Sequence, residues 1–187
     1  MANADTPMGF KPKYQLDGSP HNGGTVKCAI LAADATDTFI GDLVTLTGTA
    51  SAEGYPSVAQ GAATDTDFFG VVTSFDADPD ALGNQYRVAS TLRTCNVVPA
   101  LDTVFEVQCD GAFAITDIGN VADVVVAAGS TVTGISAMEL NSAAIGGATV
   151  NLHIIGFDQR PDNEIGTNAN VLVRINESAF RGTGTGT

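Results

Sequence analysis

The chain has 187 residues and a formal charge of −13 at pH 7, from 8 Lys and Arg against 21 Asp and Glu. This length fits one domain of ordinary size, and 44% hydrophobic with only 16% charged residues predicts a folded chain with a buried core. The acidic surface excludes nucleic acid as a partner, because it would repel a phosphate backbone. No apolar run approaches the roughly 20 residues of a membrane span, and the first residues lack the basic and apolar regions of a signal peptide.

The composition is biased towards β-strand. Val, Ile and Thr, which are β-branched and lose rotamer freedom in helices, are abundant, whereas Leu, Glu and Lys are scarce. Gly, with 21 residues, supplies together with Asp and Asn many positions that suit turns. We therefore expect an all-β protein of many short strands.

Residues 1–24 are predicted to form an extended N-terminal arm. Pro7, Pro12 and Pro20 exclude a regular helix, and three glycines interrupt any long strand. The arm carries apolar and basic side chains that a solvated tail would not need, so either a partner or the chain's own domain should cover them. If a partner covers them, deletion of the arm should leave the rest of the chain folded. The candidate interface residues are Met8, Phe10, Lys11, Lys13, Tyr14 and Leu16.

Residues 25–177 are predicted to form one β domain, followed by a flexible C-terminal tail at 178–187. Within 103–109, Val104 and Glu106 alternate with Phe105 and Val107, as expected of a strand with one core-facing side. No amphipathic helices separate the runs, which predicts an antiparallel β-barrel or β-sandwich. The segment 136–144 fits a short helix or a loop. The predicted runs are 25–32, 39–48, 68–75, 90–98, 103–109, 121–127, 130–135, 149–157 and 170–176.

The sequence offers no catalytic constellation. Its two histidines, His21 and His153, lie in the arm and in a predicted strand, and neither has an evident partner. The nucleophile-elbow, zincin, Walker A and dinucleotide-binding motifs are absent. We expect no enzyme, no catalytic residues and no cofactor.

The strongest metal candidate is an acidic turn at Asp76, Asp78 and Asp80, whose alternating carboxylates resemble the start of a calcium loop. The resemblance ends there, because Ala81 stands where the sharp turn needs Gly and Arg87 where a bidentate Glu would bind. We expect a solvated turn and no metal site.

The three cysteines, Cys28, Cys95 and Cys109, form no CxxC pair. Their odd number argues against a closed disulfide framework, so we expect three buried, reduced thiols and no disulfide. A bridge between Cys95 and Cys109 across a hairpin is the alternative.

Charge is unevenly distributed along the chain. Residues 1–27 contain all three lysines and sum to +1, residues 28–158 sum to −14, and residues 159–187 are neutral. Either the chain is an acidic domain with less acidic ends, or those ends approach an acidic partner at lower electrostatic cost.

A set of turn-and-strand segments is spread over residues 2–176: ANADTPMGFKP (2–12), LDGSPHNGG (16–24), FIGDLVTLTG (39–48), FFGVVTSFDADPD (68–80), RVASTLRT (87–94), VFEVQCDGAF (104–113), GSTVTGISAMEL (129–140) and RPDNEIGTNANVLVRIN (160–176). In these segments the chain resembles the capsid decoration (cement, or head-stabilising) proteins of tailed bacteriophages. The resemblance implies a β-rich virion protein, made in the bacterial host cytoplasm, on the outer surface of an icosahedral capsid. Its partners would be the major capsid protein and other copies of itself, as a homotrimer at threefold or quasi-threefold positions, with no nucleic acid or membrane.

Two other functions stay open. One is a carbohydrate-binding or adhesive β-domain, which the absence of Trp and the presence of only three Tyr weaken, since sugar sites commonly stack on aromatic rings. The other is a hydrolase that uses paired carboxylates in a pocket.

Overall fold

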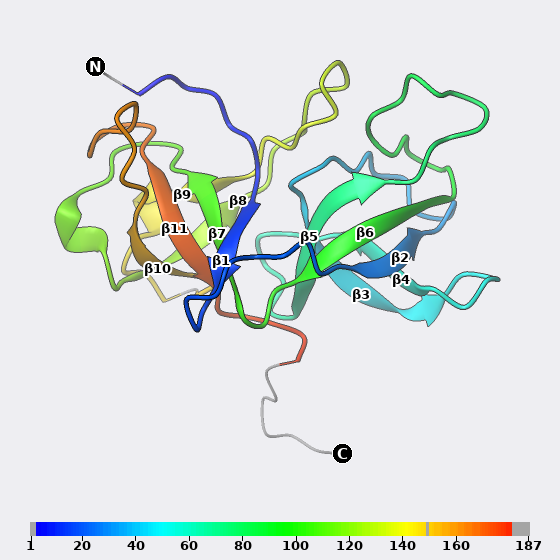
Figure 1. Ribbon diagram of the computed structural model, residues 1–187, viewed down its shortest axis with the longest axis horizontal. Coiled ribbons are helices and arrows are strands. Elements are labelled where there is room, and N and C mark those ends of the chain that lie inside the picture. The colour runs from blue at the N-terminus through cyan, green and yellow to red at the C-terminus, as the bar shows by residue number, and fades with distance from the viewer. Residues whose placement is uncertain (1–2, 149, 181–187) are drawn as a thin grey trace.

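A computed structural model describes residues 3–148 and 150–180. In these residues the chain is all-β, as predicted, and it consists of a six-stranded sheet beside a closed five-stranded barrel (Figure 1). The described residues include no α-helix, only the single 3-10 turns η1 (Ile115–Asp117) and η2 (Ser142–Ala144). None of their helical segments has the length and hydropathy that a membrane span requires.

The sheet has the strand order β1-β7-β11-β10-β8-β9, and the barrel closes in the order β2-β4-β3-β5-β6. Neighbouring strands are antiparallel except β2 and β4, which are parallel and share the single pair Ala29 and Ser57. The strands of the sheet are β1 (Lys11–Gln15), β7 (Thr103–Gln108), β8 (Val121–Val125), β9 (Glu139–Asn141), β10 (Leu152–Phe157) and β11 (Asn170–Ile175). Those of the barrel are β2 (Val26–Ile30), β3 (Leu43–Ala50), β4 (Pro56–Gln60), β5 (Phe68–Phe75) and β6 (Arg93–Pro99).

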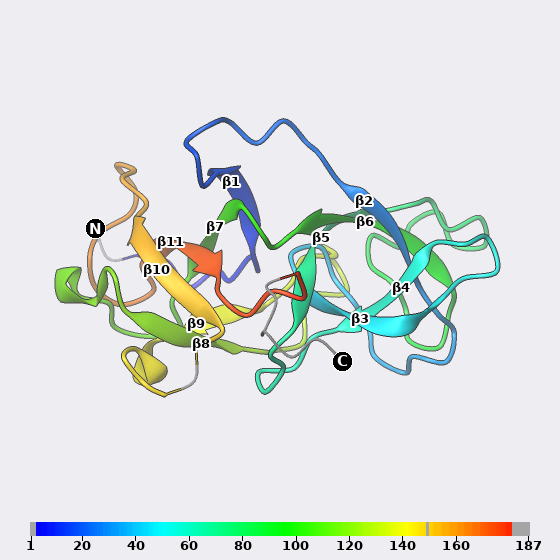
Figure 2. The same ribbon diagram turned by 90° about the horizontal axis from the view of Figure 1, so that it is seen from below.

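The whole barrel is inserted between two neighbouring strands of the sheet. The chain leaves β1, crosses to β2, and returns from β6 directly into β7, which pairs with β1 (Figure 2). A backbone hydrogen bond from Leu16 N to Asp102 O, 2.6 Å long, joins the outgoing and returning segments. Both ends of the insertion therefore leave the sheet at one place.

One hydrophobic core extends through both parts. Phe105 and Val107 of the sheet belong to the same buried cluster as Leu43, Phe68 and Val71 of the barrel. A second, smaller cluster fills the barrel interior and includes Cys28 and Cys95. Because the larger cluster takes side chains from both parts, the sheet and the barrel stabilise each other.

Most predicted runs contain a strand at nearly the predicted bounds; 68–75, for example, is β5. The run 130–135 forms turns instead, although Ile135 makes an isolated parallel bridge with Ile40. The segment 136–144, undecided between helix and loop, contains β9 and η2. Alternation did not identify β1, β4 and β9, which are short and lie beside prolines or in mixed polar segments.

The extended N-terminal arm predicted for residues 1–24 is not confirmed. Residues 11–15 form β1 at the edge of the sheet, and Phe10 is 1% exposed with its ring edge-on to that of Phe105, 6.5 Å between centroids. Pro12 is compatible with this strand because an edge strand has one side without ladder hydrogen bonds. The apolar groups of this segment are thus covered, in part, by the chain itself.

Part of the predicted C-terminal tail contacts the barrel. Ala179 N donates a 2.9 Å hydrogen bond to Phe68 O, and the rings of Phe180 and Phe69 meet edge to face at 5.6 Å. Residues 181–187, which include the low-complexity end of the tail, lie outside the described residues.

Because Phe10 is buried between the two parts, Phe10→Ala should lower the free energy of unfolding by about 3 to 5 kcal/mol. The matched control is Leu16→Ala at the other end of β1, where the side chain is 44% exposed and the expected loss is about 1 kcal/mol or less. Urea unfolding of the purified variants measures both. Equal losses, or a stable domain after deletion of residues 1–24, would contradict the integration of β1 into the fold.

Candidate functional site

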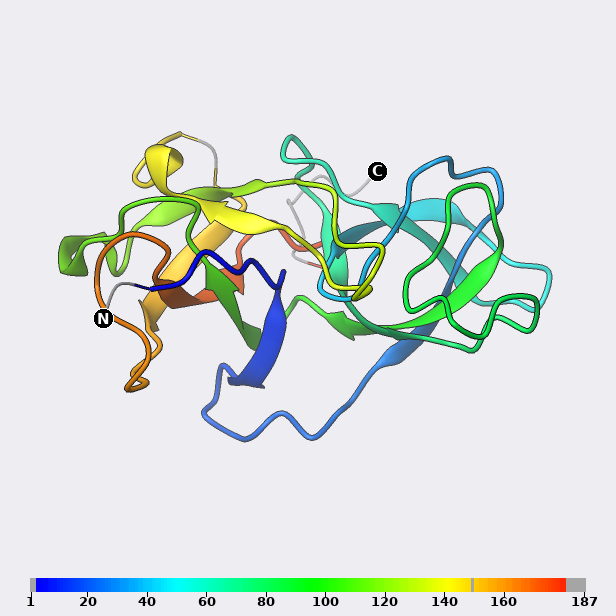
Figure 3. The same ribbon diagram turned by 90° about the horizontal axis from the view of Figure 1, so that it is seen from above.

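The six candidate interface residues lie on β1 or at its two ends, along one edge of the sheet (Figure 3). The structure divides them into residues that hold the fold together and residues that remain accessible. Phe10 is buried, whereas Met8, Lys13 and Tyr14 are half-buried and Lys11 and Leu16 are exposed.

Phe10 belongs to a junction of three segments, residues 8–10, 39–42 and 134–138, between the sheet and the barrel. Phe10 N donates to Gly41 O at 2.9 Å, and Ser136 N donates to Ile40 O at 2.8 Å. Gly9 has a φ of +65°, and a Cβ there would lie 2.5 Å from Ser136 Cβ. The close approach of the segments therefore requires glycine at this position.

Asp42 is the polar centre of this three-segment junction. Its side chain is fully buried, and Oδ2 accepts hydrogen bonds from Phe39 N and Gln60 Nε2, both 2.8 Å long. Burial raises the pKa of the Asp42 carboxyl above its ordinary value, because the charged form loses its hydration.

Lys13 is held by acidic groups of its own chain. The β1–β7 register shifts between Pro12 and Tyr14, and from this bulge Lys13 Nζ reaches Glu106 Oε2 at 2.9 Å and Asp158 Oδ2 at 3.3 Å. Arg160 Nη1 pairs with the other oxygen of Glu106 at 2.8 Å. Burial alone would lower the pKa of Lys13, but its bonds to Glu106 and Asp158 outweigh this and raise it. Lys13 therefore neutralises a buried carboxylate and is not a freely accessible cation.

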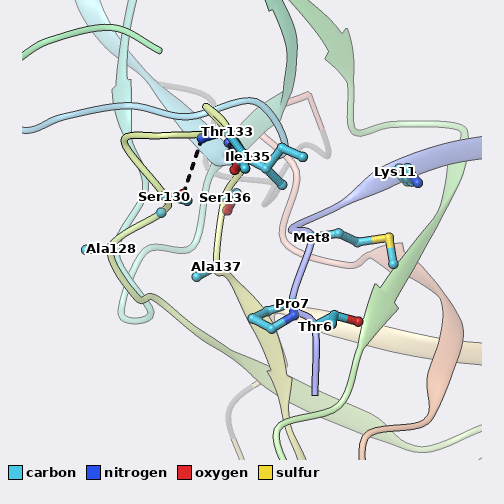
Figure 4. Close-up of a pocket in the computed structure, with 11 residues that line it drawn as sticks. Thr6, Pro7, Met8, Lys11, Ala128, Ser130, Thr133, Ile135, Ser136 and Ala137 are labelled. Carbon is cyan, nitrogen blue, oxygen red and sulfur yellow. Dashed lines mark hydrogen bonds between the residues drawn. The ribbon is translucent and has the colours of Figure 1, made fainter. Parts of the chain in front are cut away.

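Met8 and Lys11 line an open groove of about 580 Å³ between the N-terminal segment and the β8–β9 loop, residues 126–138 (Figure 4). Ile135 and Ser136 contribute from the loop, and Ser130 Oγ accepts a 3.3 Å hydrogen bond from Thr133 N. Among the described residues that line the groove, Lys11 is the only one with a charged side chain, and the others contribute apolar and hydroxyl groups. The groove suits binding of a partner surface better than acid–base chemistry.

Leu16 lies at a different depression. It lines that depression with Gln15, Asp17 and Asp102, at the point where the barrel joins the sheet. The structure therefore does not gather the six candidates into one surface. The sequence does not predict the loop side of the groove, since the pattern of 126–138 indicates only turns and a short run.

In the predicted acidic turn, the side chains of Asp76 and Asp78 form hydrogen bonds with groups of the chain itself. Asp76 Oδ2 accepts hydrogen bonds from Lys27 Nζ and Thr94 Oγ1, both 2.7 Å long, and Asp78 Oδ1 caps the backbone N of Asp80 at 3.0 Å. The hydrogen bond from Lys27 lowers the pKa of Asp76, the opposite of what a general acid needs. In residues 3–148 and 150–180, no group of three His, Cys, Asp or Glu side chains is arranged to hold a metal ion.

Within the described part of the chain, neither histidine forms a hydrogen bond or ion pair with the other histidine or with a carboxylate. His153 Nε2 lies 3.1 Å from Gly119 O, and His21 Nδ1 lies 3.4 Å from Gln15 Nε2. Both rings thus contact neutral groups. No protein-family model, curated protein or solved structure matches the chain.

Asp42 makes the stability of the junction depend on pH. Because its folded pKa is raised, its protonated form favours folding at low pH, and this contribution is lost as pH rises from the unfolded value through the folded one. Asp42→Asn removes the titration. The free energy of unfolding of the variant should therefore rise relative to that of the original chain as the pH rises above about 4, the ordinary pKa of an aspartate carboxyl. Urea unfolding of both proteins over a range of pH measures this change. If the difference between their free energies of unfolding is the same at every pH, Asp42 is not a buried group that titrates.

Proposed function

We propose that this chain is a capsid decoration protein of a tailed bacteriophage. It binds the outer surface of the icosahedral head, contacts the major capsid protein, and links neighbouring capsid subunits. Its own copies cluster around threefold or quasi-threefold positions. The protein acts by binding and requires no cofactor.

The main observation in support of this proposal is that three of the segments that resemble decoration proteins pack against one another in the structure. The segments MGF (8–10), FIGD (39–42) and GISAM (134–138) are far apart in the sequence, and together they form the three-segment junction. In this chain, three of the resembling segments thus form the contact between the sheet and the barrel. This packing supports a structural basis for the resemblance, and the proposed role follows from the resemblance itself.

The groove supplies the contact surface in this proposal. The chain carries a net charge of −13, yet the described lining of the groove contains Lys11 and no carboxylate. An acidic partner can therefore approach the lining of the groove with less electrostatic repulsion than it would meet at the exposed carboxylates of the chain. Met8 and Ile135 add apolar area, which a protein partner would bury.

Saturable binding to undecorated heads of the encoding phage tests the proposal. Purified chain should cosediment with the heads, and electron microscopy should locate its density on the outer surface near threefold positions. Absence of saturable binding, with specific binding on a glycan array, would replace the proposal by the carbohydrate-binding alternative.

Lys11→Glu should weaken binding to the heads by about tenfold, because it reverses the charge that Lys11 presents in the groove. The control is Lys27→Glu on β2, which makes the same charge change outside the groove. Because it also replaces the exposed Lys27–Asp76 ion pair by two like charges, circular dichroism first checks that both variants are folded, and the affinity of the folded control should stay within about twofold. Cosedimentation over a range of protein concentrations measures both affinities. Equal effects of the two variants would move the contact surface away from the groove.

A further inference from the structure

Two of the three thiols face each other inside the barrel. Cys28 of β2 and Cys95 of β6 are directly opposite in the antiparallel register, between the pairs Ala29 with Thr94 and Lys27 with Asn96. Both cysteines are 0% exposed and belong to the barrel core cluster. Directly opposite residues project to the same face of a sheet, so both side chains enter the barrel interior.

The backbone geometry of such a pair suits a disulfide. Directly opposite residues of antiparallel strands have Cα atoms about 4.5 to 5.5 Å apart, within the range of about 4.4 to 6.8 Å that disulfides span. All three cysteines are free thiols in this structure. We propose that Cys28 and Cys95 are a disulfide site, and that oxidation joins β2 covalently to β6.

Cys109 has no such partner. It follows β7, forms an isolated bridge with Leu140, and belongs to the larger core cluster shared by sheet and barrel. The pairing of Cys95 with Cys109, the alternative considered from the sequence, would join cysteines of two different core clusters. The register instead assigns Cys95 to Cys28 and leaves Cys109 as a single thiol.

The bond would act where the barrel closes. β2 pairs with β6 along its whole length but with β4 only at Ala29 and Ser57. β2 is also the first barrel strand after the crossing from β1, as Figure 3 shows. A disulfide at this seam would enclose residues 29–94 in a covalent loop and resist detachment of β2.

The oxidant in this proposal is a small-molecule disulfide such as oxidised glutathione. One cysteine thiolate attacks it, forms a mixed disulfide and releases one glutathione thiolate. The second cysteine thiolate attacks the protein sulfur of the mixed disulfide and releases the second glutathione thiolate. The protein loses two protons and two electrons, and the electrons remain with the two reduced glutathione molecules.

Burial makes the reaction depend on opening of the barrel. It raises the pKa of the Cys28 thiol to about 11 and is the largest cause that raises that of the Cys95 thiol to about 12, with a smaller contribution from Cys28. Since the thiolate is the nucleophile, the closed barrel should react slowly, and mild urea should accelerate the reaction. The inference does not depend on the proposed function.

The test exposes the full-length chain to oxidised glutathione in mild urea, removes the urea, alkylates the remaining thiols and maps the peptides by mass spectrometry. We expect one cystine that links Cys28 to Cys95, with Cys109 alkylated. Cys109→Ser should form the same cystine, whereas Cys28→Ala and Cys95→Ala should form none within the chain. If an alanine variant does not fold, the maps of the original chain and of Cys109→Ser still decide the pairing.

The oxidised chain should also melt about 10 °C higher than the reduced chain, since the bond closes a long loop. Differential scanning calorimetry of the two forms, with Cys109→Ser to exclude intermolecular bonds, measures the difference. A map in which Cys95 pairs with Cys109, or in which no cystine forms at any glutathione ratio, would overturn the site. An equal or lower melting temperature would overturn its role in closing the barrel.

Discussion

The antiparallel pairing of β1 with β7 is the contact on which the architecture depends. These strands are neighbours in the sheet, yet the whole barrel lies between them in the sequence. Their pairing holds both ends of the insertion together, and Phe10 then reaches Gly41 and the core beside Phe105. Without this ladder, the sheet would lose an edge strand and the junction would lose one of its three segments.

The same pairing explains a buried charge. Glu106 is 1% exposed although it lies on the face of β7 that points away from Phe105 and Val107. A buried carboxylate is tolerated only when cations and hydrogen bonds compensate for its lost hydration. The β1 bulge brings Lys13 to one oxygen, and Arg160, from the loop after β10, pairs with the other. The positive charges near the chain ends thus serve partly as internal counterions.

The local sequence pattern predicted most of the strands, because their positions follow from short β-rich runs between turns. The predicted run 68–75 has the observed bounds of β5, and in β11, which lies within the predicted run 170–176, Val171, Val173 and Ile175 are buried. β1 was missed because a segment with Pro12 and two lysines becomes a strand only when β7 is beside it. The groove and the opposition of Cys28 to Cys95 were missed for the same reason, since both depend on contacts between distant segments.

The insertion of the barrel also sets an order of events during synthesis. β1 leaves the ribosome first, but its partner β7 is made only after every strand of the barrel. At about 5 to 20 residues per second, β1 must wait roughly 5 to 20 s with Phe10 uncovered. The barrel can fold within that interval and bring the two ends of its insertion close together. Completion of the sheet then becomes a short-range step, and β1, although made before the barrel, is among the last strands to reach its final place.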